Sequence, residues 1–507
     1  MYNPNMNTPS DIQEIISLLP AATDQDIALV RKAQDFAAKA HQGQLRKSGE
    51  AYLTHLFATA KNIAELGLSA TVVAAGFLHD TIEDTSVTAG ELEREFGPEI
   101  LFLVEGVTKL GKIRYQGTNR YNESLRKLFV AMSQDIRVLI VKLCDRLHNI
   151  ETLEHVPKAK QLRIAKETLE IYAPIAYRLG IKKLQRSLED LSFKYVYPKE
   201  YAEVTKIVKE RKQDVEDRLD KFQKSLRKEL AKNGVTDFHT DYRVKGLYSL
   251  FKKLKKYHGD IEQIYDISAL RIIVPTIPDC YKVLGVIHGA WRPLPERIKD
   301  YIATPKLNGY RSIHTTIFTG DGGIIEVQIR TEEMHKEAEF GIASHISYKE
   351  GLRKKTTNPN LLWLRSILPK RIAGAEAMPA SSNLDVPTWV KELVAYQNES
   401  GDDFIDDIKT DFFEERIFVF TPKGDVIDLP KGSSVIDFAY AIHTDIGNHM
   451  SGAKVNGKFI AITTTLQNGD RIEVETKKSA KPNLKWIEYC KTAMARRRIE
   501  HFVNGSK

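Results

Sequence analysis

The feature that most constrains the fold of this chain is a predicted β-hairpin beyond its middle. Residues 313–319 and 324–330 both have strand-like patterns, and the Gly-Asp-Gly-Gly sequence at 320–323 is typical of a hairpin turn. In the second strand every other side chain is aliphatic, so these side chains share one face. The pattern predicts a sheet with an apolar face in this part of the chain.

The opposite face of the second strand carries polar groups. Glu326, Gln328 and Arg330 project from it as a carboxylate, an amide and a guanidinium. Held on one rigid strand, these groups could bind a metal ion and phosphates. An ordinary solvent-exposed strand face would have a similar composition, so the pattern alone leaves both interpretations open.

The segment before the hairpin, residues 297–315, is predicted to be a binding loop. Its aliphatic residues follow the period of neither a strand nor a helix, and Pro305 and Asn308-Gly309 punctuate it as a loop. Cations beside aromatic faces suit a ligand with both phosphates and a flat base, whereas the alternative is a solvated basic loop. The cations are Arg297, Lys299, Lys306 and Arg311, and the aromatic residues are Tyr301 and Tyr310.

Length and composition predict a globular, multi-domain protein. A chain of 507 residues typically comprises about three or four domains. No apolar run reaches the length of a membrane span, and the polar start lacks the apolar core of a signal peptide. The three cysteines fit neither a zinc spacing nor a disulfide framework, so we expect a cytoplasmic location. The net charge of +8 modestly favours phosphate-bearing ligands or RNA.

Residues 10 to about 200 are predicted to be helical. Thr23 and Asp26 have the spacing of a capping box, and an apolar stripe at helical spacing follows them. Residues 201–235 form a further helix, which is strongly charged and reads as a connector by its composition.

Two histidines and two carboxylates in the helical part form a metal-ligand pattern. This donor set suits a divalent transition metal such as Mn²⁺, which can lower the pKa of a bound water and make a nucleophile. Two further carboxylates, predicted to lie on the same helix as His79 and Asp80, could act as general base or position the water. A lone His-Asp pair is usually structural, but the joint order His, His-Asp, Asp is more specific. The candidate ligands are His55, His79, Asp80 and Asp145, and the neighbouring carboxylates are Glu83 and Asp84.

These motifs resemble the HD-superfamily hydrolase domain of the RelA/SpoT family, bacterial enzymes that make and degrade the alarmone (p)ppGpp. The resemblance lies in residues 46–50, His55, residues 79–84 and residues 145–149. It implies that the four ligands bind Mn²⁺ and that Glu83 and Asp84 serve the water. The residues that it implies in nucleotide binding are Arg46, Lys47, Asn149 and Thr152. Ala51 and Leu56 stand where the family often has proline, and neither change removes a functional side chain.

The middle of the chain resembles the synthetase domain of the same family, which has an α/β nucleotidyltransferase-like fold. There is no GxxxxGK[ST] motif, so the chain is not a P-loop enzyme. The resemblance implies that Asp266 and Glu326 bind Mg²⁺, that Glu326 also lies near the attacking 3′-hydroxyl, and that Tyr310 stacks on guanine. The implied nucleotide-binding residues are Arg243, Lys245, Ser249, Lys253, Arg271, Arg297, Lys299, Lys306, Asn308, Tyr310, His314 and Gln328.

Within this family, residues 297–300 (Arg-Ile-Lys-Asp) match the basic RxKD form of bifunctional members. The resemblance therefore implies two activities. One transfers pyrophosphate from ATP to the 3′-hydroxyl of GDP or GTP, and the other hydrolyses (p)ppGpp to GDP or GTP and pyrophosphate. Two alternatives remain: a synthetase whose hydrolase has decayed, and a tRNA- and ribosome-binding regulator with only one active catalytic domain.

Residues 412–477 resemble a TGS domain, which is a small β-grasp fold. Strands are predicted at 416–421, 425–429 and 471–474, with a capped helix from Ser434 to Ile442. His443 matches the family position that contacts the tRNA acceptor end, although an ordinary helix-end histidine is the alternative. The implied partners are uncharged tRNA and the ribosome, and no membrane is expected.

The predicted order of parts is an all-α hydrolase domain (1–200), an α/β synthetase domain with its connecting helix (201–348), a linker with short helices (349–411), the TGS domain (412–477) and the start of a helical region (478–507). Family members of full length continue further, so we expect either a truncated chain or a short member.

Overall fold

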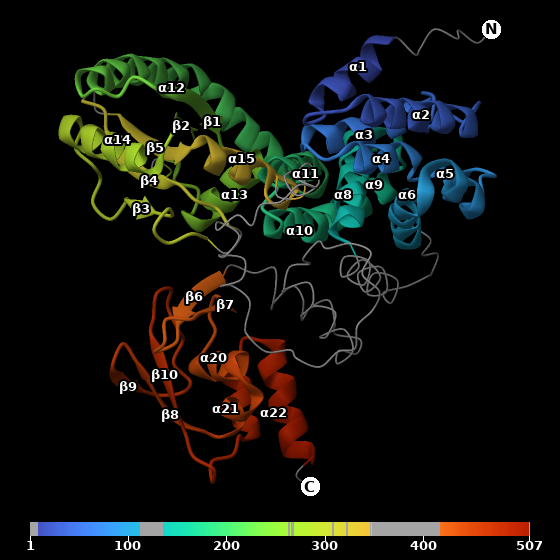
Figure 1. Ribbon diagram of the computed structural model, residues 1–507. Coiled ribbons are helices and arrows are strands. Elements are labelled where there is room, and N and C mark those ends of the chain that lie inside the picture. The colour runs from blue at the N-terminus through green and yellow to red at the C-terminus, as the bar shows by residue number, and fades with distance from the viewer. Residues whose placement is uncertain are drawn as a thin grey trace. The chain divides into compact units, whose positions relative to one another are not determined.

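The computed structural model describes residues 9–111 and 135–505, apart from 262–263, 265–267, 307–308, 321–322, 345 and 347–415. Described residues up to 346 belong to one compact unit, and those from 416 onward belong to a second (Figure 1). The predicted linker at 349–411 lies outside the described residues, and so do Asp266 and Asn308.

The first part of the first unit is helical, as predicted. The Thr23–Asp26 capping box is formed at the start of α2. Helix α4 is the centre of this part, because eight of its nine residues are buried and it packs against α2, α3 and α6. The elements are α1 (Pro9–Leu18), α2 (Asp24–Ala40), α3 (Leu53–Glu65), α4 (Ala70–Leu78), α5 (Thr81–Asp84), α6 (Ala89–Gly111), α8 (Ile136–Glu151), η1 (Leu153–His155), α9 (Lys158–Glu167), η2 (Thr168–Tyr172), α10 (Ala173–Arg178) and α11 (Lys182–Val196).

The prediction of one continuous helix through residues 79–84 is wrong. Helix α4 ends at Leu78, His79 is its C-cap residue, and Asp80 precedes the short helix α5. Side chains satisfy the terminal carbonyls, since His79 Nδ1 lies 2.8 Å from the Gly76 oxygen and the Thr81 hydroxyl donates to the Leu78 oxygen at 2.6 Å. The break brings His79 and Asp80 to the end of a buried helix.

The predicted charged helix is α12 (Pro198–Lys232), but it is more than a connector. Leu219, Phe222, Leu226 and Leu230 on its second half are buried against the sheet that follows. The overall composition does not reveal this role, because the many charged residues of the helix outnumber the four apolar residues that lie at helical spacing.

The sheet of the first unit has the strand order β1-β2-β5-β4-β3. The predicted hairpin is confirmed as the antiparallel pair β4–β5, while β2 and β5 are parallel. Ile325, Val327 and Ile329 lie in a core shared with α12 and α14. The elements are β1 (His239–Val244), α13 (Leu247–Lys256), β2 (Ser268–Val274), α14 (Ile277–Ala290), β3 (Lys299–Asp300), β4 (Ile313–Phe318), β5 (Ile324–Thr331) and α15 (Glu332–Phe340).

The second unit is a small α/β body. Its capping box at Ser434 and Asp437 is formed as predicted, and a three-stranded sheet of order β10-β8-β9 accompanies the β6–β7 pair. Its elements are β6 (Arg416–Phe420), β7 (Val426–Pro430), α20 (Val435–Ile442), α21 (Thr444–Asn448), β8 (Met450–Val455), β9 (Lys458–Ile460), β10 (Ile472–Thr476), η6 (Leu484–Tyr489) and α22 (Ala493–Gly505). Among the helices that the structure describes in either unit, none is both long and apolar enough to cross a membrane.

Candidate functional site

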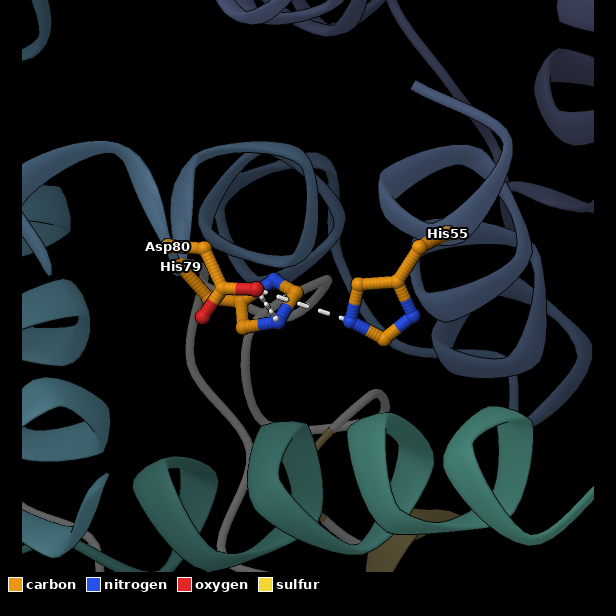
Figure 2. A group of neighbouring side chains, drawn as sticks. All are labelled: His55, His79 and Asp80. Atoms are coloured by element: carbon orange, nitrogen blue, oxygen red, sulfur yellow. Dashed lines mark ion pairs between the residues drawn. The ribbon is translucent and has the colours of Figure 1, made fainter. Parts of the chain in front are cut away.

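The four predicted metal ligands lie together in the helical part of the first unit. His55 on α3 meets His79 and Asp80 at the α4–α5 break, with one possible ligand atom of each within 4.8 Å of the others (Figure 2). Asp145 on α8 joins them, since its Oδ1 lies 3.3 Å from His55 Nε2 and 3.8 Å from His79 Nε2. Both histidines are buried.

The chemistry of this cluster fits a divalent metal ion. His79 is oriented by the Gly76 carbonyl at Nδ1, so Nε2 of a neutral ring offers a lone pair. That Nε2 lies 3.1 Å from Asp80 Oδ2, yet it is buried and makes no hydrogen bond to any described residue. A buried nitrogen of this kind beside carboxylates is suited to bind a cation.

The charges in the cluster are strongly coupled. Burial opposes protonation of His79, but Asp80 and Asp145 outweigh it and raise the pKa of His79 to about 9. Burial also opposes ionisation of Asp145, but Lys142, whose Nζ lies 2.8 Å from Asp145 Oδ2, helps to lower the pKa of this carboxyl well below its usual value. The pKa of Asp80 is likewise lowered, against the effect of burial, by His79 and His55, so Asp80 and Asp145 are both ionised. A divalent cation could replace the protons that they attract.

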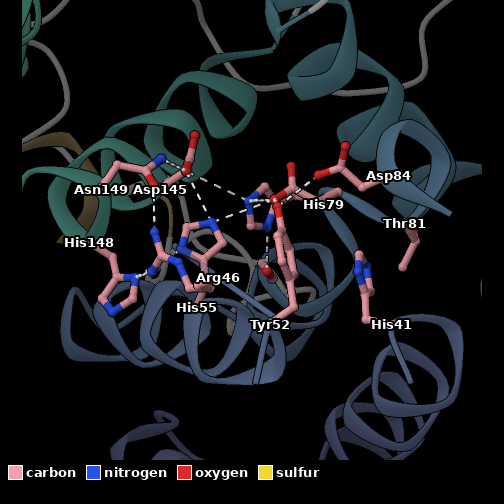
Figure 3. Close-up of polar contacts among 12 residues, drawn as sticks. His41, Arg46, Tyr52, His55, His79, Thr81, Asp84, Asp145, His148 and Asn149 are labelled. Atoms are coloured by element: carbon pink, nitrogen blue, oxygen red, sulfur yellow. Dashed lines mark hydrogen bonds and ion pairs between the residues drawn. The ribbon is translucent and has the colours of Figure 1, made fainter. Parts of the chain in front are cut away.

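Arg46 and Asn149, two of the predicted nucleotide-binding residues, lie beside this cluster (Figure 3). Arg46 donates to Asn149 Oδ1 at 3.0 Å, and Asn149 donates to Asp145 Oδ1 at 2.5 Å. Thr152 is the C-cap residue of α8 and donates its hydroxyl to the His148 carbonyl, while Lys47 is exposed. The structure thus brings a cation and an amide next to the candidate ligands.

Sequence reasoning gave no role to His148 and Tyr52, which also touch this site. His148 Nδ1 lies 2.9 Å from His55 Nδ1 and 2.6 Å from Arg46. Burial, followed by His55 and Arg46, lowers the pKa of His148 to about 3, so this ring is neutral. Tyr52 donates toward Asp80 and Asp84. The sequence signal for Tyr52 was its position three residues before His55, which places the two side chains about one helical turn apart at the start of α3.

A second polar cluster lies on the sheet, where the polar face of β5 is buried. The exposed fraction is 0% for Gln328 and 1% for Arg330, so the interpretation as an ordinary exposed strand face is wrong. The side chains form a closed ring of contacts. Glu326 contacts His314 at 3.0 Å, His314 contacts the Tyr310 hydroxyl at 2.8 Å, Arg330 donates to Tyr310 and Gln328, and Gln328 donates to Glu326.

Cations surround this ring of contacts. Lys306 lies 4.6 Å from the centre of the Tyr301 ring and 5.6 Å from that of Tyr310. Burial, followed by Lys299 and Arg243, lowers the pKa of Lys306 to about 8. Perturbed pKa values of this kind cluster at functional sites, and the neighbouring cations could bind an anionic ligand.

The other predicted nucleotide-binding residues have diverse surroundings. Arg271 on β2 pairs with Asp241 and Glu339, and the Ser249 hydroxyl lies 3.4 Å from a Glu189 oxygen. Arg297 and Lys299 are exposed, whereas Lys245 and Lys253 are partly buried. Arg330 was considered for phosphate binding from the strand pattern but is not among the residues that the family resemblance implies. It is the largest of the described side chains with almost no exposed surface.

Comparisons with known proteins cover all three parts of the chain. Family models match an HD domain at residues 33–182, the region found in RelA/SpoT proteins at 242–353 and a TGS domain at 417–476. A guanosine-3′,5′-bis(diphosphate) 3′-pyrophosphohydrolase of Borreliella burgdorferi is 40% identical over 479 residues, which cover 93% of this chain and 67% of that relative. The chain belongs to the RelA/SpoT family.

Two further relatives of this RelA/SpoT chain carry different names. A GTP pyrophosphokinase of Myxococcus xanthus is 44% identical, and the match covers 95% of this chain and 61% of that relative. A probable guanosine-3′,5′-bis(diphosphate) 3′-pyrophosphohydrolase of Synechocystis sp. is 42% identical, with 94% and 61% covered. The chain thus spans about three fifths of the length of these two relatives. The predicted fold class of an HD domain, an α/β synthetase-type domain and a TGS domain is confirmed.

In the TGS domain of this RelA/SpoT chain, His443 is exposed at the start of α21. Its Nδ1 accepts a hydrogen bond from the Asp445 backbone nitrogen at 3.2 Å. The ring therefore caps a short helix and keeps its other edge available at the surface, which is compatible with both interpretations of this residue.

Proposed function

We propose that this chain is a bifunctional alarmone enzyme that synthesises and hydrolyses (p)ppGpp. Relatives along most of the chain are named for one activity or the other. The observation that carries the proposal is that two chemically different clusters of polar side chains lie in separate parts of the first unit. One is the buried histidine–carboxylate cluster of the HD domain, and the other is the Glu326–His314–Tyr310 ring of contacts among cations.

In the proposed hydrolase site, His55, His79, Asp80 and Asp145 would bind Mn²⁺. When bound, this ion lowers the pKa of a water molecule and supplies a nucleophile near neutral pH. Glu83 and Asp84 would orient that water and accept its proton. The guanidinium of Arg46, with Lys47, Asn149 and Thr152, would bind the nucleotide, so that water attack releases the 3′-linked pyrophosphate and leaves GDP or GTP.

In the proposed synthetase site, Asp266 and Glu326 would bind Mg²⁺ and Glu326 would lie beside the 3′-hydroxyl that attacks ATP. His314 contacts Glu326 at 3.0 Å and is held in turn by Tyr310, which supports a positioned carboxylate. Tyr310 would stack on guanine, and Arg243 and Arg271 would stack on adenine. The lysines would bind the phosphates. The pyrophosphate of ATP moves to the 3′-oxygen and AMP leaves, by positioning and charge stabilisation.

The remaining predicted nucleotide-binding residues all belong to the proposed synthetase site. Ser249, Arg297, Lys299, Asn308 and Gln328 would complete the synthetase site, together with Lys245 and Lys253 from the segment around α13. The proposed substrates, ATP and GDP or GTP, are intracellular, so the proposal implies a cytoplasmic location.

The TGS domain supports a second candidate role, as a reader of uncharged tRNA on the ribosome through His443. In a regulator of this class only one catalytic domain would be active. The paired clusters in the first unit favour the enzyme with both activities, and the tRNA contact would then control it.

The test is a nucleotide assay on the purified chain. With ATP, GDP and Mg²⁺, we expect ppGpp and AMP in equal amounts. With ppGpp, we expect GDP and pyrophosphate when Mn²⁺ is added and little product with Mg²⁺ alone. Absence of either reaction under its own conditions would favour the regulator with a single active domain.

A further inference from the structure

We infer that Tyr52, supported by His41 and Gln44, is a positioning residue that fixes Asp84 beside the candidate metal ligands. The inference deepens the proposed hydrolase function and rests on it. Glu83 and Asp84 were both expected to serve the water, and the inference concerns Asp84, to which the contacts described next belong.

The Tyr52 hydroxyl lies between two carboxylates. It is 2.7 Å from Asp80 Oδ2 and 2.8 Å from Asp84 Oδ2 (Figure 3). A phenol has a single proton, which it must therefore share between the two acceptors. One acceptor belongs to the metal-type cluster, while Asp84 is an exposed residue at the end of the four-residue helix α5. Tyr52 thus connects an otherwise weakly held carboxylate to the cluster.

Asp84 is held a second time, through its backbone. Gln44 Nε2 donates to the Asp84 carbonyl oxygen at 2.8 Å, and Gln44 Oε1 lies 2.8 Å from His41 Nδ1. The Tyr52 backbone nitrogen donates to the Gln44 carbonyl at 3.0 Å. The His41 ring lies parallel to the Tyr52 ring, with 4.8 Å between the centres and an angle of 3° between the planes. These contacts close a circuit of four residues, His41, Gln44, Tyr52 and Asp84.

The hydrogen bonds in this circuit fix its protonation. Because Gln44 donates through Nε2, its Oε1 accepts, and Nδ1 of His41 must carry the proton. His41 Nε2 is buried without a hydrogen-bond partner among the described residues, which leaves the ring neutral in this arrangement. A neutral ring can support Tyr52 without adding a positive charge beside a metal site.

The chemical consequence is a carboxylate that stands next to the metal ligands without being one of them. A general base or water-orienting group must be held in this way, since a small displacement from the reacting water lowers the rate of proton transfer. We therefore assign to Tyr52 the task of holding Asp84, and to His41 and Gln44 the task of holding Tyr52 and the Asp84 backbone.

The test is a double-mutant cycle of Y52F and D84N in the full chain. Y52F keeps the ring and its stacking and removes only the hydroxyl. At saturating Mn²⁺ and ppGpp, kcat for pyrophosphate release should fall about 10–100-fold in Y52F while KM changes little. Y52F in the D84N background should cause no further loss, because Tyr52 acts through Asp84. Tyr195→Phe, a tyrosine of α11 outside this circuit, is the matched control and should leave kcat unchanged.

Two further measurements make the outcomes unambiguous. Binding of Mn²⁺ to each variant without substrate, followed by electron paramagnetic resonance, separates a lost metal site from a displaced Asp84. Synthesis of ppGpp by Y52F reports that the protein is folded. A kcat for Y52F within about twofold of wild type, or losses that multiply in the double variant, would overturn the inference. A wild-type chain that does not hydrolyse ppGpp at all would instead refute the proposed function.

Discussion

The Nζ atom of Lys182 lies 3.1 Å from the centre of the Tyr310 ring. Lys182 is the first residue of α11 and the last residue of the HD-domain match, whereas Tyr310 lies in the RelA/SpoT region. The backbone supports the same contact, since the Ile342 nitrogen donates to the Leu179 oxygen at 2.9 Å. Tyr310 is only 4% exposed. A side chain from the HD-domain match therefore covers the ring that is proposed to stack on guanine.

This contact predicts that Lys182→Ala binds GDP more tightly. A flat base and the lysine cannot occupy the same face of the ring, so the base must displace the lysine. Burial, with Arg330 and Arg243, lowers the pKa of Lys182 well below its usual value, so the contact is weaker than one with a fully charged lysine. The expected gain is about threefold to tenfold in calorimetry, from a cation–π contact of about 1 kcal/mol.

The matched control for Lys182 is its neighbour in sequence. Lys183 pairs with Glu65 on the surface, and its side chain is 51% exposed, so Lys183→Ala should leave GDP affinity unchanged. Weaker GDP binding by the Lys182 variant would mean that this lysine contacts the nucleotide rather than covering its place.

The same contact predicts communication between the two sites. Lys182 in the HD-domain match touches Tyr310 in the RelA/SpoT region, so this contact offers a direct route for the coupling. In a synthetase-inactive Glu326→Gln chain, a non-hydrolysable ATP analogue with GDP should weaken ppGpp binding at the hydrolase site by about 1–3 kcal/mol. Adding Lys182→Ala should reduce this coupling. Unchanged ppGpp affinity with and without the analogue would show that the sites act independently.

The two activities are also expected to be separable by mutation. His79→Ala removes a buried candidate ligand, and ppGpp hydrolysis should be abolished while synthesis is retained. Loss of Mn²⁺ binding in the same variant would tie the effect to the metal. His501→Ala, an exposed histidine of α22, is the control. Simultaneous loss of both reactions in a variant that unfolds at the wild-type temperature would contradict the assignment.

Much of the fold was readable because local patterns agreed with the tertiary structure. The β4–β5 hairpin and both capping boxes were predicted from alternation and turn residues, which act over a few neighbours. The prediction of helix ends failed where tertiary contacts determine where a helix stops. The break between Leu78 and Thr81 depends on side chains that take helix-end carbonyls, and no apolar period reveals that.

The candidate site was predictable where residue types are chemically distinctive. Two histidines and two aspartates are recognisable as ligands, but Tyr52, His41 and Gln44 are not, because their importance comes from a circuit that closes only in three dimensions. Arg330 was visible on the strand, yet its almost complete burial depends on what covers the polar face. The sequence shows which side chains are present, whereas the contacts between them depend on how the chain packs.

Nucleotide binding at the proposed synthetase site should weaken as the pH rises through about 8, the pKa to which burial, Lys299 and Arg243 lower Lys306. Below that pH Lys306 is an ammonium that can bind phosphate, and above it the charge is lost. ATP affinity should fall about tenfold between about pH 7 and pH 9.5, since a charge-assisted hydrogen bond contributes about 1.5–3 kcal/mol. Lys306→Arg, which stays charged, should flatten this dependence. An equally steep loss in the arginine variant would assign the titration to another group.

The last prediction concerns the distribution of charge around the TGS domain. The matched region, 417–476, has five basic and seven acidic residues, whereas residues 477–498 have eight basic and one acidic, nearly the whole excess of +8 in the chain. This basic segment is packed on the TGS core. Asp437 accepts hydrogen bonds from the backbone nitrogens of Lys491 and Thr492 and from the Thr492 hydroxyl.

If the proposed tRNA contact exists, the basic segment should supply most of its phosphate binding. Each lysine–phosphate contact releases counterions, so the slope of log affinity against log salt should decrease by about 0.7–0.9 for every contact removed. Changing the exposed residues Lys477, Lys478 and Lys481 to glutamine should therefore weaken binding of a tRNA transcript and flatten its salt dependence. The same change at Lys423, Lys431 and Lys458, which lie within 417–476, should have little effect. Equal losses in the two triple variants would show that general surface charge, rather than the basic segment, attracts the RNA.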